Sequence, residues 1–290
     1  MNGTGVPMAT PFDDSGAVDE SKLRAVASWV VDRGVDFVVP AGSNSESELM
    51  TLDERARVVA TVADEVSVPV LAGTGHPGLV ETLEGTRRAA EAGADAALVV
   101  TPFYFEHSQA DLAAYYREVA DGSPLPVYLY DVPKMTGARL EPETVAGLAD
   151  HDNVVGIKDS GGDLVTFQRT RRMTGPDFET FVGSGGLYAP ALDAGADGGV
   201  LALANAVPDL ASEVYDRHRE GDVAGARELC ADLVELNRAI TAEYGVPGVK
   251  AAMRHRGAPA GQPRSPHRPL DEDATREVRA LVDEALETWG

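Results

Sequence analysis

The stretch NVVGIKDSGGD (153–163) begins as an apolar segment, runs directly into Lys158 and ends in a glycine-rich turn. An apolar run without polar alternation is typical of a strand that is buried on both faces of a parallel sheet. A charged amine at the end of such a strand is costly unless it is paired or neutral. A lysine here therefore needs a physical reason, since the chain has only Lys22, Lys134, Lys158 and Lys250.

Seven further short apolar runs lie along the chain, and helical patterns separate them. They are GVPMATPF (5–12), FVVPAGS (37–43), PVLAGTG (69–75), ALVVTPF (97–103), PVYLYDVP (126–133), FVGSG (181–185) and GVLALAN (199–205). Eight strand–helix units of similar length predict an α/β fold, a (β/α)8 TIM barrel over residues 1–210. A doubly wound sheet is the alternative, but it seldom needs eight such even units.

Helix boundaries are marked by residues with known capping roles. The sequences RGVD (33–36), AGAD (92–95) and AGAD (194–197) each place a glycine where a helix ends in the left-handed C′ position. Thr51 and Glu54 form a capping box that opens a helix over 52–65. Pro142 suits the first turn of another helix.

Only helical patterns follow residue 210. We expect helices over 208–220, 222–241, 246–255 and 271–288, with a Pro/Gly-rich connector at 256–269. The predicted organisation is therefore a barrel at 1–210 and a small C-terminal helical extension at 211–290.

The charge of the chain limits its partners. The 290 residues carry 25 Lys+Arg against 47 Asp+Glu, a formal net charge of −22. Such a surface repels polyanions, so no nucleic acid and no acidic membrane is expected as a partner. The few lysines and many acids favour adaptation to a high-salt, halophilic cytoplasm; a GC-rich genome that favours Arg and Asp is the alternative.

The sequence also predicts where the protein resides. Cys230 is the only cysteine, so no intrachain disulfide forms. The N-terminal MNGTGVPMATPF lacks the basic and apolar regions of a signal peptide. No stretch reaches the ~18 consecutive apolar residues of a membrane span. A cytoplasmic protein is expected.

The predicted strand ends bring reactive groups to one face of the barrel, where the chemistry of such folds takes place. A desolvated lysine is more easily neutral, and a neutral amine attacks a carbonyl to give a Schiff base that stabilises a neighbouring carbanion. Lys158 is the candidate amine, and Tyr130, at the preceding strand end, is the candidate proton shuttle. The loop Gly42-Ser43-Asn44 offers N–H groups and a hydroxyl to a carboxylate.

Each of these residues also has a purely structural interpretation. Lys158 can pair with a neighbouring acid, and Tyr130 can be a packed barrel residue. The loop at 42–47 can be an ordinary turn in which Ser and Asn bond locally. The functional interpretation rests on their coincidence at three strand ends of one barrel.

Five segments together resemble the class I, pyruvate-dependent aldolase family that includes dihydrodipicolinate synthase, N-acetylneuraminate lyase and 2-keto-3-deoxygluconate aldolase. They occur in the family's order and spacing over almost the whole chain. They are VPMATPF (6–12), GSNSESELMTLDER (42–55), ALVVTPFYF (97–105), YLYDVPKMTG (128–137) and VVGIKDSGGDL (154–164).

The resemblance implies a set of roles. Lys158 would be the Schiff-base lysine, Tyr130 the proton shuttle and Ser43 the hydroxyl of the proton relay. Asn44, with Ser43, would hold the pyruvate carboxylate. Tyr104 would enter a neighbouring subunit's site, which implies a homo-oligomer, commonly a tetramer. Gly183 and the carbonyl of Val200 would line the pyruvate pocket.

Departures from the family pattern bear on the substrate. Met135 stands where the synthase has an arginine that binds the aspartate-semialdehyde carboxylate, and methionine makes no such contact. Asp131 replaces an asparagine, and Ser45 replaces a loop glycine, so the loop backbone is open to change. Lys134, beside the lost arginine, is a candidate contact for a phosphate or hydroxyls, or else a solvated loop residue.

The resemblance is closest in character to the 2-keto-3-deoxy-(6-phospho)gluconate aldolase of a halophilic archaeon. We therefore expect a lyase that cleaves this sugar acid to pyruvate and glyceraldehyde (3-phosphate), as in a modified Entner–Doudoroff pathway. The alternatives are 4-hydroxy-tetrahydrodipicolinate synthase, then a keto-deoxy-sugar-acid dehydratase or sialic acid lyase, and, outside catalysis, an inactive barrel with a binding role. No metal or organic cofactor is expected, because no metal-ligand spacing appears among the six histidines.

Overall fold

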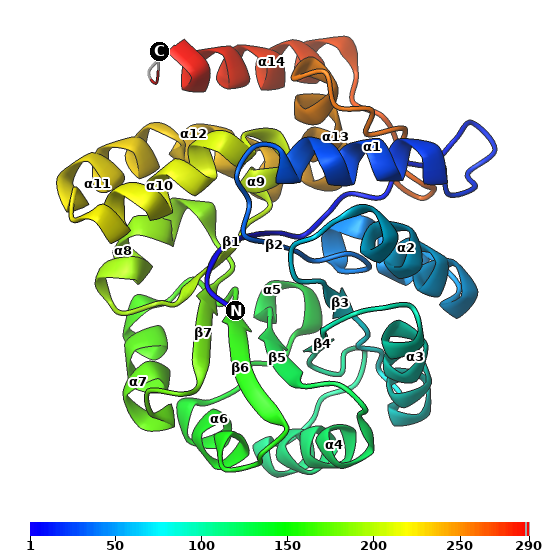
Figure 1. The fold of residues 1–290 in the computed structure, drawn as a ribbon, viewed down its shortest axis with the longest axis vertical. Helices are drawn as coiled ribbons and strands as arrows, with labels where there is room; N and C mark the ends of the chain where they lie inside the picture. Colours follow the sequence, from blue (N-terminus) through cyan, green and yellow to red (C-terminus); the bar gives the residue numbers. More distant parts are fainter. Residues whose placement is uncertain (288, 290) are drawn as a thin grey trace.

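Eight strands and the helices that follow them form the core of the computed structural model, which describes residues 1–287 and 289 (Figure 1). The strands are short and apolar, as the sequence predicts. They are β1 (Gly3–Val6), β2 (Phe37–Val38), β3 (Leu71–Gly73), β4 (Ala96–Val100), β5 (Val127–Asp131), β6 (Val154–Asp159), β7 (Glu179–Val182) and β8 (Gly198–Val200).

The strands form one parallel sheet in the order β2-β1-β8-β7-β6-β5-β4-β3. A parallel bridge between Val38 and Val70 joins the two ends of this order, and the N–H of Val38 donates to the Pro69 carbonyl at 3.0 Å. The ring of strands is thereby almost closed, which confirms the TIM barrel.

A ring of helices surrounds the strands. The α-helices up to the eighth unit are α1 (Glu20–Val31), α2 (Leu52–Glu65), α3 (Leu79–Glu91), α4 (Gln109–Gly122), α5 (Pro133–Thr136), α6 (Pro142–Ala149), α7 (Leu164–Thr174), α8 (Tyr188–Asp193), α9 (Leu203–Ala206) and α10 (Pro208–Glu220). Short 3-10 turns lie at η1 (Ser43–Ser45), η2 (Ser47–Leu49) and η3 (Gly185–Leu187).

The C-terminal part is helical, as expected, but more broken than predicted. It consists of α11 (Val223–Asp232), α12 (Val234–Arg238), the π-helix η4 (Ala239–Glu243), α13 (Gly245–His255) and α14 (Glu272–Glu287). The prediction of one helix over 222–241 is therefore wrong, because the chain bends at Leu233 and then widens into the π-helix. The predicted last helix extends to residue 288, which lies outside the described residues. The proposed domain boundary at 210 falls within α10 and stays a prediction.

Two apolar layers hold the barrel together. Inside the barrel, the aromatic ring of Phe181 packs against those of Phe37 and Tyr128, with centroid distances of 5.3 and 6.0 Å. A larger layer of buried residues lies between the strands and the surrounding helices. Burial on both faces explains why the strands lack polar alternation.

The capping signals in the sequence are confirmed. Gly34, Gly93 and Gly195 adopt φ of +90°, +92° and +93°, a region that side-chain-bearing residues avoid. Thr51 and Glu54 bond reciprocally at the start of α2. Pro142 is the first residue of α6.

Two strand boundaries differ from the prediction. The run at 5–12 forms a strand only over Gly3–Val6, and the run at 199–205 leaves the sheet after Val200 and forms α9. Asn205 explains both turns: its Nδ2 donates to the Pro7 carbonyl at 2.9 Å, and its Oδ1 accepts from the Ala9 N–H at 2.9 Å. Its buried amide therefore fastens the ends of β1 and β8 to each other.

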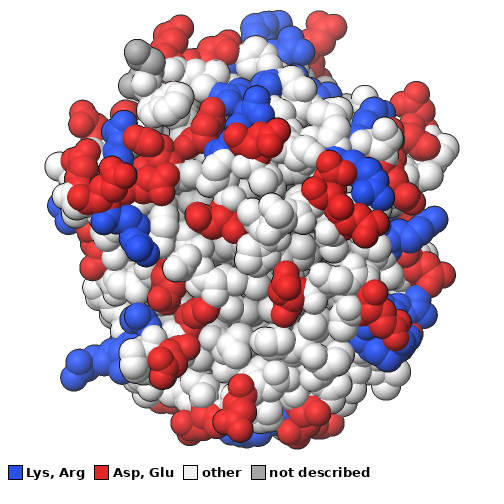
Figure 2. Space-filling view, viewed as in Figure 1, with Lys and Arg blue, Asp and Glu red and all other residues white. Residues whose placement is uncertain are grey.

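Figure 2 shows acidic side chains spread over one face of the molecule, with basic side chains beside many of them. Across residues 1–287 and 289, no helix combines the length and the apolar character that a bilayer crossing requires.

Candidate active site

Lys158 and Tyr130 lie side by side at the ends of β6 and β5. They are register partners in the parallel pair, so both side chains point into the barrel. Lys158 is 5% exposed, and its Nζ lies 4.2 Å from the centroid of the Tyr130 ring. The amine thus lies over the face of the ring, within the range of a cation–π contact.

The Lys158 amine has no hydrogen bond or ion pair with any residue that the structure describes. Asp131 and Asp159, which follow Tyr130 and Lys158 in their strands, are the next register pair and point to the opposite face of the sheet. Asp131 accepts the Leu140 N–H at 3.0 Å, and Asp159 accepts the Gly161 N–H at 2.7 Å. The interpretation of Lys158 as half of a structural ion pair is therefore wrong.

The two carboxylates behind Lys158 are themselves buried. Burial raises the pKa of Asp131 to about 7, and burial also raises the pKa of Asp159. The Nε of Arg139 lies 4.0 Å from Asp131 Oδ2. Because position 131 holds an aspartate in place of the asparagine of the family pattern, a titratable group lies behind the candidate site.

A cavity of about 290 Å³ opens above Lys158. It brings together seven of the eight residues selected from the sequence: Ser43, Asn44, Tyr130, Lys134, Lys158, Gly183 and Val200. Met135, Ser160, Ser184 and residues of the C-terminal helices complete the lining. Among the described residues, the only charged side chains in this lining are Lys134 and Lys158, although the whole chain carries −22. The cavity is thus suited to an anion.

The loop after β2 presents backbone donors to this cavity. Ser43–Ser45 form the turn η1, and no described residue accepts a hydrogen bond from the N–H of Ser43 or Asn44. Ser45 is buried, and its hydroxyl donates to the Met8 carbonyl at 2.5 Å. Because Ser45 has an ordinary φ, a serine in place of glycine fits this backbone without strain.

A second buried lysine, for which the sequence predicted no role, anchors the same loop. Lys250 in α13 is fully buried and donates to the Thr10 carbonyl at 2.7 Å, the Gln262 carbonyl at 2.8 Å and Glu46 Oε1 at 2.6 Å. Burial lowers the pKa of Lys250 to about 8. The available signals were the scarcity of lysine and Glu46 as the single charge in loop 42–47.

Glu46 connects this lysine to the C-terminal connector. Its Oε2 accepts from the Arg264 N–H at 2.8 Å and lies 2.9 Å from His267 Nδ1. Glu46 adopts φ of +58°, a left-handed conformation that is unfavourable for a glutamate. These bonds hold the residue in place and thereby fix the turn that carries Ser43 and Asn44.

Tyr104 is the one selected residue that lies outside the Lys158 cavity. Its side chain is 87% exposed, its φ is +81°, and its ring meets that of Phe105 edge to face at 5.0 Å. It lines an adjacent open hollow of about 540 Å³ that shares Met135 with the Lys158 cavity. Within one chain, Tyr104 therefore makes no contribution to the cavity wall.

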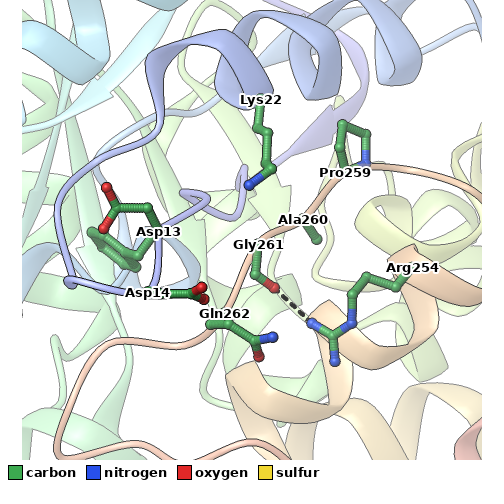
Figure 3. A pocket seen from close by; sticks show the side chains of 9 residues that line it. Asp13, Asp14, Lys22, Arg254, Pro259, Ala260, Gly261 and Gln262 are labelled. Carbon is green, nitrogen blue, oxygen red and sulfur yellow. Dashed lines mark hydrogen bonds between the residues drawn. The ribbon is translucent and has the colours of Figure 1, made fainter.

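A separate hollow of about 310 Å³ lies between the start of α1 and the connector after α13 (Figure 3). Four charged side chains line it. Lys22 pairs with Asp19 at 2.8 Å, and Arg254 donates to the Gly261 carbonyl at 2.7 Å. Asp13 accepts the N–H groups of Ser15 and Ala17, and Asp14 is the fourth. The hollow contains none of the residues selected from the sequence.

Within residues 1–287 and 289, no group of three or more His, Cys, Asp or Glu side chains is arranged to hold a metal ion. The prediction that the protein needs no cofactor is not tested by this arrangement.

Comparison with known proteins places the chain among similar enzymes. The model of the Dihydrodipicolinate synthetase family matches residues 1–285. An uncharacterized DapA-like lyase of Halobacterium salinarum is 40% identical over 289 residues, covering 99% of this chain and 95% of that protein. A 4-hydroxy-tetrahydrodipicolinate synthase of Methanothrix thermoacetophila is 37% identical over 282 residues, covering 97% of this chain and 96% of that protein.

Solved structures agree with these sequence matches. YagE, a prophage protein of E. coli K12 solved in complex with pyruvate, superposes with a TM-score of 0.94 at 30% identity, with 99% of each chain covered. Dihydrodipicolinate synthase DapA-2 of Bacillus anthracis gives the same TM-score and identity, with 97% of each chain covered.

Proposed function

The chain belongs to the dihydrodipicolinate synthetase family of pyruvate-dependent carbon–carbon lyases, and from this membership we propose that it cleaves 2-keto-3-deoxy-(6-phospho)gluconate to pyruvate and glyceraldehyde (3-phosphate). The observation that carries the proposal is the buried, unpaired Lys158 amine at the base of a cavity without carboxylates. The reaction is a reversible aldol cleavage.

Lys158 supplies the electron sink. Its neutral amine attacks the C2 carbonyl of the keto acid, and loss of water gives an iminium. When the C3–C4 bond breaks, its electron pair moves toward the iminium and forms an enamine, while the C4 hydroxyl loses its proton and becomes the aldehyde carbonyl. Protonation of the enamine at C3 and hydrolysis of the imine release pyruvate and regenerate the amine.

Tyr130 is placed to move the proton of the C4 hydroxyl. It lines the cavity, and the Lys158 amine lies over its ring. As a phenolate it accepts this proton, and as a phenol it returns a proton to C3. Ser43, at the cavity edge, is proposed to extend the relay.

The carboxylate of the keto acid is proposed to bind at the loop after β2. The unbonded N–H groups of Ser43 and Asn44 are donors that suit a carboxylate. Gly183 and Val200 line the same cavity and leave room for the pyruvate portion. With the carboxylate held there, C2 faces Lys158.

The remainder of the cavity favours a hydroxylated substrate over aspartate semialdehyde. Met135 lines it where a carboxylate-binding arginine would be needed, and a thioether makes no bidentate contact with a carboxylate. Lys134 also lines the cavity and has no ion pair with any described residue. A single flexible ammonium group suits a phosphate or hydroxyls at the far end of the substrate.

A second candidate is 4-hydroxy-tetrahydrodipicolinate synthase. It is supported by relatives of that name, such as the 37% identical Methanothrix protein. In the condensation direction both reactions begin with the same pyruvate Schiff base, so the two candidates differ in the aldehyde that this adduct attacks. An inactive barrel is disfavoured because such a protein has no need to bury an unpaired amine.

We propose a homotetramer in which Tyr104 enters the site of a neighbouring subunit. The exposed ring, the strained backbone at φ +81° and the exposed Phe105 beside it support a role at an interface. Light scattering on the intact protein measures the oligomeric state, and the proposal expects four chains. A monomer that retains full activity would contradict it.

We place this activity in a high-salt cytoplasm, in a modified Entner–Doudoroff pathway. The net charge of −22 and the similarity to a Halobacterium salinarum protein support the halophilic setting.

Parallel assays in high-potassium buffer test the proposed substrate. The purified protein is given 2-keto-3-deoxygluconate, its 6-phosphate, or pyruvate with aspartate semialdehyde, and pyruvate release or consumption is followed. We expect pyruvate release from at least one sugar acid and no condensation with the semialdehyde. Condensation with the semialdehyde and no cleavage of either sugar acid would establish the second candidate instead.

A further inference from the structure

The wall of the Lys158 cavity that comes from the C-terminal helices contains an amide with no partner. Asn237 in α12, Ile240 and Thr241 in η4, and Gly245 and Val246 at the start of α13 form this wall. The strand ends hold the reactive lysine and tyrosine, so this wall meets the part of a ligand that extends beyond them. In the proposed reaction, that part becomes the aldehyde.

Asn237 is nine-tenths buried, yet its amide bonds to nothing that the structure describes. It is 9% exposed, and its Oδ1 is closed to solvent without a donor. Two other buried oxygens among the described residues share this condition, those of Thr10 and Ser212, but neither residue lines the Lys158 cavity. A buried amide without a partner is unfavourable unless a ligand completes its bonds.

Gly185 makes room for this amide, whereas Gly186 only borders it. A Cβ at Gly185 would lie 2.7 Å from Asn237 Oδ1, and one at Gly186 would lie 3.7 Å from Nδ2. Neither glycine has a left-handed φ, so the backbone does not require glycine at these positions. Glycine is required at position 185 because the Asn237 side chain occupies the space that a Cβ would fill.

The groups around Asn237 are neutral hydrogen-bonding groups. The Thr241 hydroxyl donates to the Asn237 carbonyl at 2.6 Å, which leaves its own lone pairs as acceptors. Ser160 and Ser184 also line the cavity. Such groups match the hydroxyls of a sugar chain, which donate and accept, better than they match a carboxylate.

We propose that Asn237 determines substrate specificity by hydrogen bonding to a hydroxyl of the substrate beyond the cleaved bond. This inference rests on the proposed aldol reaction and extends it by naming the residue that recognises a polyhydroxylated aldehyde portion. The amide donates to the hydroxyl oxygen through Nδ2, which, unlike Oδ1, is not closed to solvent. Pyruvate itself does not reach this residue.

The test compares two aldehydes in the condensation direction, each with pyruvate: D-glyceraldehyde, which has hydroxyls, and propanal, which has none. Wild-type protein is expected to prefer glyceraldehyde in kcat/KM. Asn237→Leu is expected to lose about 10-fold with glyceraldehyde, the value of one hydrogen bond, and to change little with propanal. Gly185→Ala displaces the Asn237 amide without altering it. This variant is also expected to lower the ratio of kcat/KM for glyceraldehyde to kcat/KM for propanal.

Ser212→Ala is the matched control, because it removes another buried, unpartnered oxygen away from the cavity. Its preference is expected to equal that of the wild type. Exchange of the pyruvate C3 protons with deuterium, which needs Lys158 but no aldehyde, is expected to be unchanged in Ser212→Ala and to persist in the other two variants.

Two results would overturn the assignment in distinguishable ways. If the wild type exchanges no pyruvate C3 protons, the aldol reaction itself is wrong, and the role of Asn237 is lost with it. A second outcome is normal exchange together with an unchanged preference for glyceraldehyde over propanal in both Asn237→Leu and Gly185→Ala. The aldol reaction then stands, and Asn237 does not hydrogen bond to the substrate hydroxyl.

Discussion

Two of the four lysines are buried and lie over an aromatic ring, but they differ in the hydrogen bonds of their amines. Lys250 is surrounded by three oxygen acceptors at 2.6 to 2.8 Å, one of them the Glu46 carboxylate. Lys158, 5% exposed, has only an aromatic ring at 4.2 Å and an open cavity. Structural burial of a charge requires that its bonds be satisfied. The amine that is buried without them is therefore the one available for chemistry.

The two lysines nevertheless serve one site. Lys250 fixes Glu46 in the loop that carries Ser43 and Asn44, and Lys158 faces the same cavity from β6. One region thus provides rigidity and the other reactivity. Substitutions should separate the two contributions.

The largest effect is expected from Lys158→Met. Turnover should fall on the order of 10⁴-fold or more, because the Schiff base has no substitute nucleophile. The free energy of unfolding should stay the same or rise, since an unpaired amine is replaced by an apolar chain of similar length. Steady-state kinetics and chemical denaturation measure the two quantities. A strongly destabilised variant would mean that Lys158 has a structural partner.

Lys250→Met should show the opposite pattern. Removing one partner of a buried ion pair leaves Glu46 Oε1 without its only cation, while Oε2 keeps its bonds to Arg264 and His267, so the free energy of unfolding should fall by about 3 kcal/mol. The folded fraction should still form the pyruvate Schiff base, because Lys158 is intact.

Lys22→Met is the control for Lys250→Met. Lys22 pairs with Asp19 at the surface, where its side chain is 45% exposed, and its loss should cost only about 0–1 kcal/mol. Equal destabilisation by the two substitutions would contradict a structural role that is specific to Lys250.

Asp131→Asn probes the carboxylate behind Lys158 through pH. Burial raises the pKa of Asp131 to about 7, whereas the unfolded chain releases this proton near the ordinary value of 3.8. The folded state therefore binds more protons between these two pH values, and its stability falls as pH rises through that window. The variant should lack this loss.

The size of the difference follows from the pKa shift. Relative to the wild type, Asp131→Asn should gain up to about 4 kcal/mol at pH 8 and nothing near pH 4. Denaturation curves of both proteins across this range measure it, with Asp163→Asn at an exposed carboxylate as the control. The same difference at both ends of the range would show that Asp131 does not titrate as described.

Salt is expected to have the smallest and most general effect. With a net charge of −22, repulsion destabilises the folded chain, and raising KCl from about 0.1 M to about 2 M shortens the screening distance from ~10 Å to below ~3 Å. The midpoint of thermal unfolding should rise by several degrees in the wild type, in Lys158→Met and in Lys250→Met alike. A midpoint that does not depend on salt would contradict the halophilic proposal.

The barrel was accessible from the sequence because its signals are local. Apolar runs mark the strands, and Gly34, Gly93 and Gly195 mark helix ends through a conformation that favours glycine. The strand limits were less accessible, because Asn205 fixes two of them by bonds to Pro7 and Ala9, which lie 198 and 196 residues away in the sequence. The π-helix at 239–243 likewise has no pattern of its own in the sequence.

In the candidate site too, some residues could be predicted from the sequence and others could not. Lys158, Tyr130 and the loop at 42–44 were identified because strand ends converge in any such barrel. Lys250 and Asn237 were missed, because they come from helices beyond the barrel and reach the site through tertiary packing. The direction in which Asp131 and Asp159 point, away from Lys158, became evident only from the strand register.

The most direct test of the central claim is to trap the pyruvate adduct with borohydride and to locate it by mass spectrometry of the intact chain and its peptides. The account predicts one adduct per chain, on the peptide that contains Lys158, and none in Lys158→Met protein that is shown to be folded. An adduct on Lys134 or Lys250, or no adduct on folded wild-type protein, would contradict the assignment of Lys158 as the reactive amine.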